Sequence, residues 1–145
     1  MQSLQIRFFE RGTMIRETFE ESLEVVFVEK GKYDYGYEVN KKRMFRRRFQ
    51  HSTIIGGFEI IQNKRHMFLI RAHTKIQGYA VIKKDWVSIM KEFPYFKSEI
   101  SKKLSYFYYK QIYRPLIEIK NKNVARIERR KDYHQLLTVS QHTSQ

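Results

Sequence analysis

Short apolar runs separated by glycine or polar turns fill the first half of the chain, a pattern typical of β-strands rather than helices. Strands are predicted at residues 6–9, 14–15 and 23–28, because each run is apolar or β-branched without a helical period. Residues 33–39 alternate strictly, so one face of that strand carries Tyr33, Tyr35, Tyr37 and Val39. The pattern predicts a mainly antiparallel β fold.

A strand, a glycine pair, one helical turn, a loop and a second strand follow one another within residues 53–72. The glycine pair is Gly56-Gly57, the apolar turn is 58–61, and the second apolar run is 67–70. Glycine accepts a positive φ and allows another group to approach the backbone closely. This layout can present free N–H groups at a helix N-terminus, where an anion binds. A plain turn at a barrel corner is the other interpretation of the glycine pair.

Helical periodicity replaces alternation in the second half of the chain. Asp85 is a suitable N-cap for a helix with the apolar stripe Trp86, Ile89, Met90 and Phe93, which Pro94 ends. A longer helix is predicted at residues 95–113, and Pro115 is expected to interrupt it. We therefore expect a β-roll with its following helices at 1–113, a basic helical extension at 114–137 and a disordered tail at 138–145.

Several landmarks between residues 9 and 94 follow the order and approximate spacing of one known family. They are Phe9, Gly12, Ile15, the strand at 25–28, Gly31, the stretch GGFEIIQNKRHMFLIRA, the junction Lys83-Lys84-Asp85-Trp86 and the pair Phe93-Pro94. In these landmarks the chain resembles the cyclic-nucleotide-binding domain family. The resemblance implies an antiparallel eight-strand jelly-roll β-barrel, with a short helix in its phosphate-binding cassette and C-terminal helices packed on the barrel.

The cassette keeps the family's frame but not its two ligand-reading side chains. Gly56 aligns with the first glycine, His66 falls on the phosphate-binding arginine, and Gly57 falls on the acid that holds the ribose 2′-hydroxyl. Glu59 and Arg65 lie within one or two residues of those positions and could substitute. The resemblance implies a cAMP or cGMP site with weak or lost binding, because the charge-assisted phosphate contact is missing. Its candidate residues are Gly56, Gly57, Phe58, Glu59, Ile60, Arg65 and His66.

The overall pattern is most similar to the cytoplasmic gating domain of cyclic-nucleotide-gated-like potassium channels, and the Lys-, Asn-, Ile- and Tyr-rich composition to divergent ciliate channels. This implies a regulatory role at the cytoplasmic face of a plasma or ciliary membrane, where binding on the barrel moves the helices and biases the gate of a pore subunit. Because the chain starts at the first strand, we expect either a channel fragment or a free-standing protein. A structural protein that kept the fold and binds an acidic protein partner is the alternative.

The charge distribution adds acidic partners to this picture. The formal net charge is +14, and residues 1–40 carry −3 whereas residues 41–145 carry +17. The densest basic run, 41–48, lies between two predicted strands, with Phe45, Arg47 and Phe49 expected on one face. A solvated hairpin, a contact with an acidic protein or lipid, and nucleic-acid binding are the alternatives for this run, the last of them the least favoured.

Enzyme chemistry has no positive support in the sequence. There is no cysteine, the histidines lack metal-ligand spacing, and Glu59 is the only carboxylate in residues 50–74. No apolar run approaches the ~18 residues of a membrane span, and residues 1–11 lack the apolar core of a signal peptide. The sequence therefore predicts a non-enzymatic cytoplasmic domain with no metal and no cofactor beyond a cyclic-nucleotide ligand.

Overall fold

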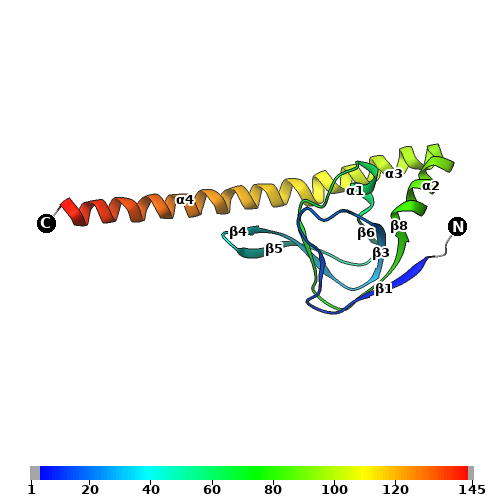
Figure 1. The fold of residues 1–145 in the computed structure, drawn as a ribbon, viewed down its shortest axis with the longest axis horizontal. Helices are drawn as coiled ribbons and strands as arrows, with labels where there is room; N and C mark the ends of the chain where they lie inside the picture. The colour runs from blue at the N-terminus through cyan, green and yellow to red at the C-terminus, as the bar shows by residue number, and fades with distance from the viewer. Residues whose placement is uncertain (1–3, 144–145) are drawn as a thin grey trace.

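Two four-stranded antiparallel sheets form a β-barrel in the computed structural model, which describes residues 4–143 (Figure 1). The first sheet has the order β1 (Gln5–Phe9), β8 (Ile76–Ile82), β3 (Glu24–Lys30) and β6 (Thr53–Ile55). The second has the order β2 (Met14–Arg16), β7 (Leu69–Ala72), β4 (Tyr33–Val39) and β5 (Lys42–Phe49). The predicted jelly-roll β fold with helices packed on it is confirmed.

The tyrosines that were predicted to share one face of β4 point into the barrel. Tyr33, Tyr35 and Tyr37 are all almost completely buried and belong to the main core. Phe49 of β5 packs against the first two of these rings, with centroid distances of 5.9 and 5.5 Å. The interior of the barrel is thus filled by aromatic side chains at the positions where a strand period of two directs them.

The predicted shared face of Phe45, Arg47 and Phe49 is wrong at its first member. A register shift opposite Tyr35 and Gly36 makes residue 46 an extra residue on β5, so the side-chain alternation slips by one. Phe45 consequently lies on the outer side of the sheet, with the guanidinium of Arg71 3.8 Å from its ring centroid.

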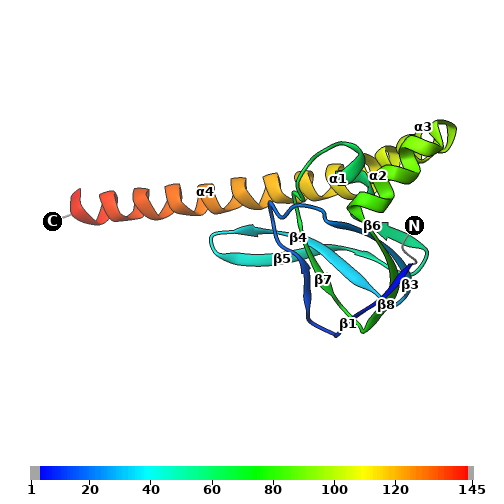
Figure 2. The ribbon, with the colours of Figure 1, turned by 45° about the vertical axis from the view of Figure 1, so that its right-hand side comes forward.

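The helices are α1 (Gly57–Ile61) in the cassette, α2 (Lys83–Glu92), α3 (Pro94–Phe107), the π-helical segment η1 (Tyr108–Tyr113) and α4 (Arg114–Thr143). Figure 2 shows α3, η1 and α4 as one continuous rod that lies along the barrel and extends beyond the β4–β5 hairpin. Disorder was expected from residue 138, whereas α4 continues to Thr143; residues 144–145 lie outside the described part.

The first helix after the barrel starts three residues earlier than predicted. Its N-cap is Ile82, not Asp85, and the N–H of Lys83 donates to the carbonyl of Leu23 at 2.8 Å. This bond continues the pairing of β3 with β8 by one more residue and so fixes the start of α2 next to β3. Asp85 instead lies in the first turn, where its negative charge interacts favourably with the helix dipole.

Pro115 does not interrupt the rod, contrary to the prediction. A proline inside a helix removes an N–H donor and crowds the carbonyl four residues earlier, here that of Gln111. The turn widens into η1 just before the proline. The freed carbonyl accepts a hydrogen bond from Nε of Arg47 at 2.9 Å, and the Gln111 side-chain oxygen accepts one from Arg47 Nη2 at 2.8 Å. A partner from β5 therefore compensates the proline.

Replacing Arg47 with leucine should lower the free energy of unfolding by about 1–3 kcal/mol, because a carbonyl within the rod loses its charged donor. Arg46→Leu is the matched control, since that side chain is exposed and bonds only the adjacent Phe45 carbonyl. We expect it to stay within about 0.5 kcal/mol of the wild type. Urea unfolding measures both, and equal effects of the two substitutions would argue against the Arg47–Gln111 contact.

Residues of the rod complete the core of the barrel. Tyr108, Ile112 and Leu116 are buried together with the barrel residues of the main cluster. A second cluster joins α1 and α2 to β3 and contains Val25, Ile60, Trp86 and Met90. The rod is therefore an integral part of the folded domain.

Among residues 4–143, no helix is both long and apolar enough to cross a membrane.

Candidate ligand cradle

The cassette turn depends on glycine at position 56. Gly56 has φ +92°, and its carbonyl accepts a hydrogen bond from the Ser22 hydroxyl at 3.0 Å. A β-carbon there would lie 2.5 Å from the Glu24 carbonyl oxygen and 2.6 Å from Ser22 Oγ. The side chain is thus excluded by both backbone conformation and space. This tight turn sets the direction in which α1 leaves β6.

Glu59 lies in the first turn of α1 and is only 4% exposed. Burial raises its pKa to about 7, while a hydrogen bond from its own backbone N–H and the positive charge of Arg16 act in the opposite direction. A backbone amide of the cassette helix, the type of group that would bind a phosphate, is therefore covered by the chain's own carboxyl group.

His66 lies beside this carboxyl group, with Nδ1 3.6 Å from Glu59 Oε1. Its ring is 1% exposed, and its pKa falls to about 4 because burial and, secondarily, Arg16 disfavour the imidazolium. The backbone fixes the position, since its N–H donates to the Glu20 carbonyl and its own carbonyl accepts from the Phe19 N–H. Near neutral pH the ring is uncharged, so it lacks the positive charge of the arginine found at this position in the resembled family.

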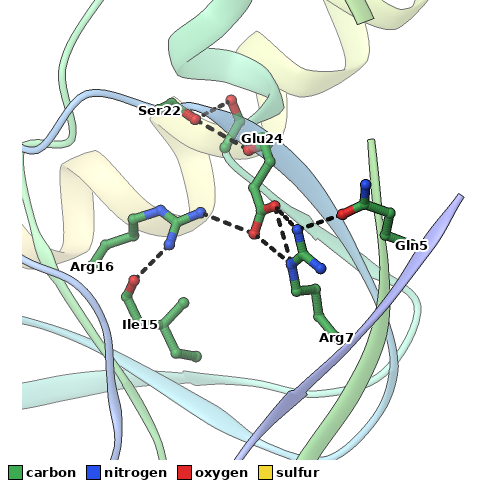
Figure 3. Close-up of polar contacts among 7 residues, drawn as sticks. Gln5, Arg7, Ile15, Arg16, Ser22 and Glu24 are labelled. Atoms are coloured by element: carbon green, nitrogen blue, oxygen red, sulfur yellow. Dashed lines mark hydrogen bonds and ion pairs between the residues drawn. The ribbon is translucent and has the colours of Figure 1, made fainter. Parts of the chain in front are cut away.

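The positive charge of Arg16 acts on both members of this pair, and no sequence pattern indicated this residue. Figure 3 shows Glu24 between Arg16 and Arg7, with Nη2 atoms 3.8 and 2.9 Å from its carboxylate oxygens. Arg16 Nη1 also donates to the Ile15 carbonyl at 2.6 Å. The three charged residues come from three different strands, so no local motif could reveal them. Arg16 is thus engaged by Glu24 and by backbone.

Of the remaining candidate residues, Ile60 and Arg65 line a small pocket of about 170 Å³ together with Glu59, and Gly57 is not part of its lining. A β-carbon at Gly57 would meet Leu104 of α3 at 3.1 Å, so this position faces the helices. Ile60 is buried in the second core cluster. Arg65 is exposed and donates to the Phe19 carbonyl at 3.1 Å. Of the predicted pair that could substitute for the lost ligand contacts, only Glu59 points into the domain.

A pocket of about 510 Å³ lies outside this buried pair, between the cassette loop and η1. Phe58 forms one wall and stacks on Tyr108 with a centroid distance of 3.9 Å. Its other lining residues are Phe19, Lys64, Arg65, Met67, Tyr109 and Tyr113. The pocket is aromatic with two cations at its rim, but the buried Glu59 and His66 are not part of its lining.

No group of three or more His, Asp or Glu residues suited to a metal ion occurs in the described part of the chain.

Comparison with known proteins matches the fold but not the sequence. No family model matches the chain, and no curated protein matches it either. The cAMP-bound regulatory domain of Toxoplasma gondii PKA aligns with a TM-score of 0.56 at 16% identity, over 69% of this chain and 39% of that chain. The Thermus thermophilus catabolite activator protein aligns with a TM-score of 0.63 at 10% identity, over 84% and 55%.

An EAL enzyme, Bd1971 in a half-site-occupied form, aligns with a TM-score of 0.59 at 16% identity, over 71% of this chain and 96% of that chain. At such identities these likenesses concern the fold alone, and this chain spans well under half of the PKA regulatory chain. The order of the strands, the short cassette helix and the helices after the barrel are the elements that the cyclic-nucleotide-binding resemblance implies. The chain therefore has the fold of a cyclic-nucleotide-binding-like domain.

Proposed function

We propose that this chain is a regulatory domain of the cyclic-nucleotide-binding type whose cassette binds cAMP and cGMP weakly or not at all. The observation that carries the proposal is the buried pair formed by Glu59 of α1 and His66 of the loop that follows this helix. A backbone amide of the cassette helix donates to the Glu59 carboxyl group, and an uncharged imidazole stands at the position where the resembled family has an arginine. Both features disfavour a bound phosphate.

The missing arginine–phosphate contact is large enough in free energy to weaken nucleotide binding strongly. Removing one partner of a buried charge pair costs ~2–4 kcal/mol, which corresponds to roughly 30- to 1000-fold in affinity. The pKa of Glu59, about 7, adds to this, because a large fraction of this group is negatively charged at neutral pH and repels a phosphate. A site of micromolar affinity would become millimolar.

The regulatory part of the proposal rests on how the rod contacts the cassette. Phe58 of α1 stacks on Tyr108 of η1, and the ring of Tyr109 meets Phe58 edge-on at 5.6 Å. A displacement of the cassette would therefore move the rod, and a displacement of the rod would move the cassette. A role in gating a cation channel at the cytoplasmic face of a plasma or ciliary membrane, with a pore subunit as partner, fits this coupling and belongs to the proposal.

Thermal unfolding with 1 mM cAMP or cGMP tests the binding claim. A cassette with a dissociation constant of 10 μM would gain about 2.7 kcal/mol at this concentration, or roughly 5–10 °C in melting temperature. We expect a shift below about 1 °C with either nucleotide. A shift of several degrees that 5′-AMP does not reproduce would refute the proposal.

A further inference from the structure

Residues of the β4–β5 hairpin and of α4 line a groove. Figures 1 and 2 show this hairpin beside α4, at the end of the barrel away from α3. Asn123 of α4 holds its two walls together, because its side-chain amide donates to the Tyr37 hydroxyl and lies 3.7 Å from Met44 Sδ. The groove has a volume of about 260 Å³. Its lining residues are Val39, Asn40, Lys42, Met44, Asn123, Arg126, Ile127 and Arg130.

This groove combines an apolar floor with exclusively positive charge. Val39, Met44 and Ile127 supply the apolar atoms, while Lys42, Arg126 and Arg130 supply three cations and no carboxylate lines it. Arg126 and Arg130 are four residues apart, so they lie on one face of α4. Among the described residues, none of these three cations forms an ion pair within 4.0 Å.

A second, shallower depression continues the positive surface over the outer side of β5. It shares Lys42 and Met44 with the groove, and its other lining residues are Arg43, Phe45, Arg46 and Arg71. Arg43 is the only one of these cations with a carboxylate partner among the described residues, Glu17 at 3.1 Å. The groove and this depression together form one surface, which we term the hairpin–rod surface.

We propose that the hairpin–rod surface binds an acidic peptide segment of a partner protein, with an apolar side chain of that segment inserted between Met44 and Ile127. Unpaired cations around an apolar floor are complementary to carboxylates that flank an apolar residue. This inference concerns a surface distinct from the cassette and does not depend on whether a nucleotide binds there.

Nucleic acid fits this surface less well. Phosphates need only the cations, and single-stranded bases gain their affinity by stacking on aromatic rings. The groove has no aromatic residue in its lining, and the one aromatic ring of the depression, Phe45, already carries the Arg71 guanidinium 3.8 Å from its centroid. A flat bilayer surface would leave the apolar floor of the groove unfilled. An acidic peptide uses both the floor and the charges.

Fluorescence anisotropy of the full chain at 0.15 M salt tests the proposal. The probe is a labelled 15-residue peptide of glutamate with leucine at alternating third and fourth positions, and the comparison peptide carries the same charge with serine in place of leucine. We expect the leucine peptide to bind at least tenfold more tightly, because only it fills the apolar floor. Equal affinity of the two peptides, or no binding of the leucine peptide, would overturn the proposal.

Charge reversal then locates the site. Arg126→Glu/Arg130→Glu should lower affinity for the leucine peptide at least tenfold, whereas Lys102→Glu/Lys103→Glu on α3, with the same change in net charge, should stay within threefold. Ile127→Ser should abolish the preference for leucine over serine. Equal losses in the two double variants would show that only net charge matters. Tighter binding of a 20-base-pair duplex or of phosphatidylserine vesicles than of the leucine peptide would equally overturn the assignment.

Discussion

Truncating Leu116 to alanine should lower the free energy of unfolding by about 2–5 kcal/mol, the range for deleting a fully buried leucine side chain. Leu116 lies one residue after Pro115, is 0% exposed and shares the main core with the barrel strands. Alanine leaves a cavity between α4 and the barrel, because the Leu116 side chain fills this space in the wild type. The effect is large because it weakens both the core and the attachment of the rod.

Leu136→Ala on the same helix is the matched control, since that side chain is 67% exposed. It should change the free energy of unfolding by less than about 0.5 kcal/mol. Urea unfolding of the two variants at one pH decides the question. Similar small effects of both substitutions would show that α4 is not packed on the barrel as described.

The second large effect is the pH dependence of the free energy of unfolding, to which Glu59 and His66 contribute with opposite signs. The Glu59 pKa is raised from 4.5 to about 7, so between these pH values the folded chain keeps a proton that the unfolded chain has lost, and stability falls as pH rises. The His66 pKa is lowered from 6.5 to about 4, so there the unfolded chain binds the extra proton, and stability rises with pH. Each group contributes about 3 kcal/mol to this pH dependence of the free energy of unfolding.

These opposite trends nearly cancel in the wild type between pH 4.5 and 6.5, and single substitutions expose them. Relative to the wild type, Glu59→Gln should gain stability as pH rises from 4 to 7, by up to about 3 kcal/mol, because the Glu59 penalty is gone. His66→Gln should lose a similar amount between pH 4 and 6.5. Urea unfolding at half-unit pH intervals measures the slopes. Parallel profiles for all three proteins would contradict the shifted pKa values of Glu59 and His66.

Much of the barrel could be predicted from local patterns. The alternation of Tyr33, Tyr35 and Tyr37 predicted that they share one face of β4, and the glycine pair at 56–57 predicted the turn into α1. These features succeed because period and backbone conformation are properties of consecutive residues. The fold class could be predicted because strands, cassette and helices follow one another along the chain in a recognisable order.

The features that local patterns could not predict depend on contacts between distant residues. Pro115 continues a helix because Arg47, 68 positions earlier, supplies a donor to Gln111 (4 residues before the proline). The Arg16–Glu24–Arg7 cluster joins three strands that only the folded sheets bring together. The sequence placed Glu59 and His66 in one cassette, but their mutual contact and their burial depend on the whole barrel.

Calorimetric titration of cAMP and cGMP into the wild-type chain, up to 1 mM at pH 7.5, tests the central claim most directly. At this pH the Glu59 carboxyl group is largely ionised and the His66 ring is neutral. The account predicts no saturable binding below about 1 mM for either nucleotide and no difference from 5′-AMP. Saturable binding of cAMP or cGMP with a dissociation constant below about 100 μM, absent for 5′-AMP, would contradict it.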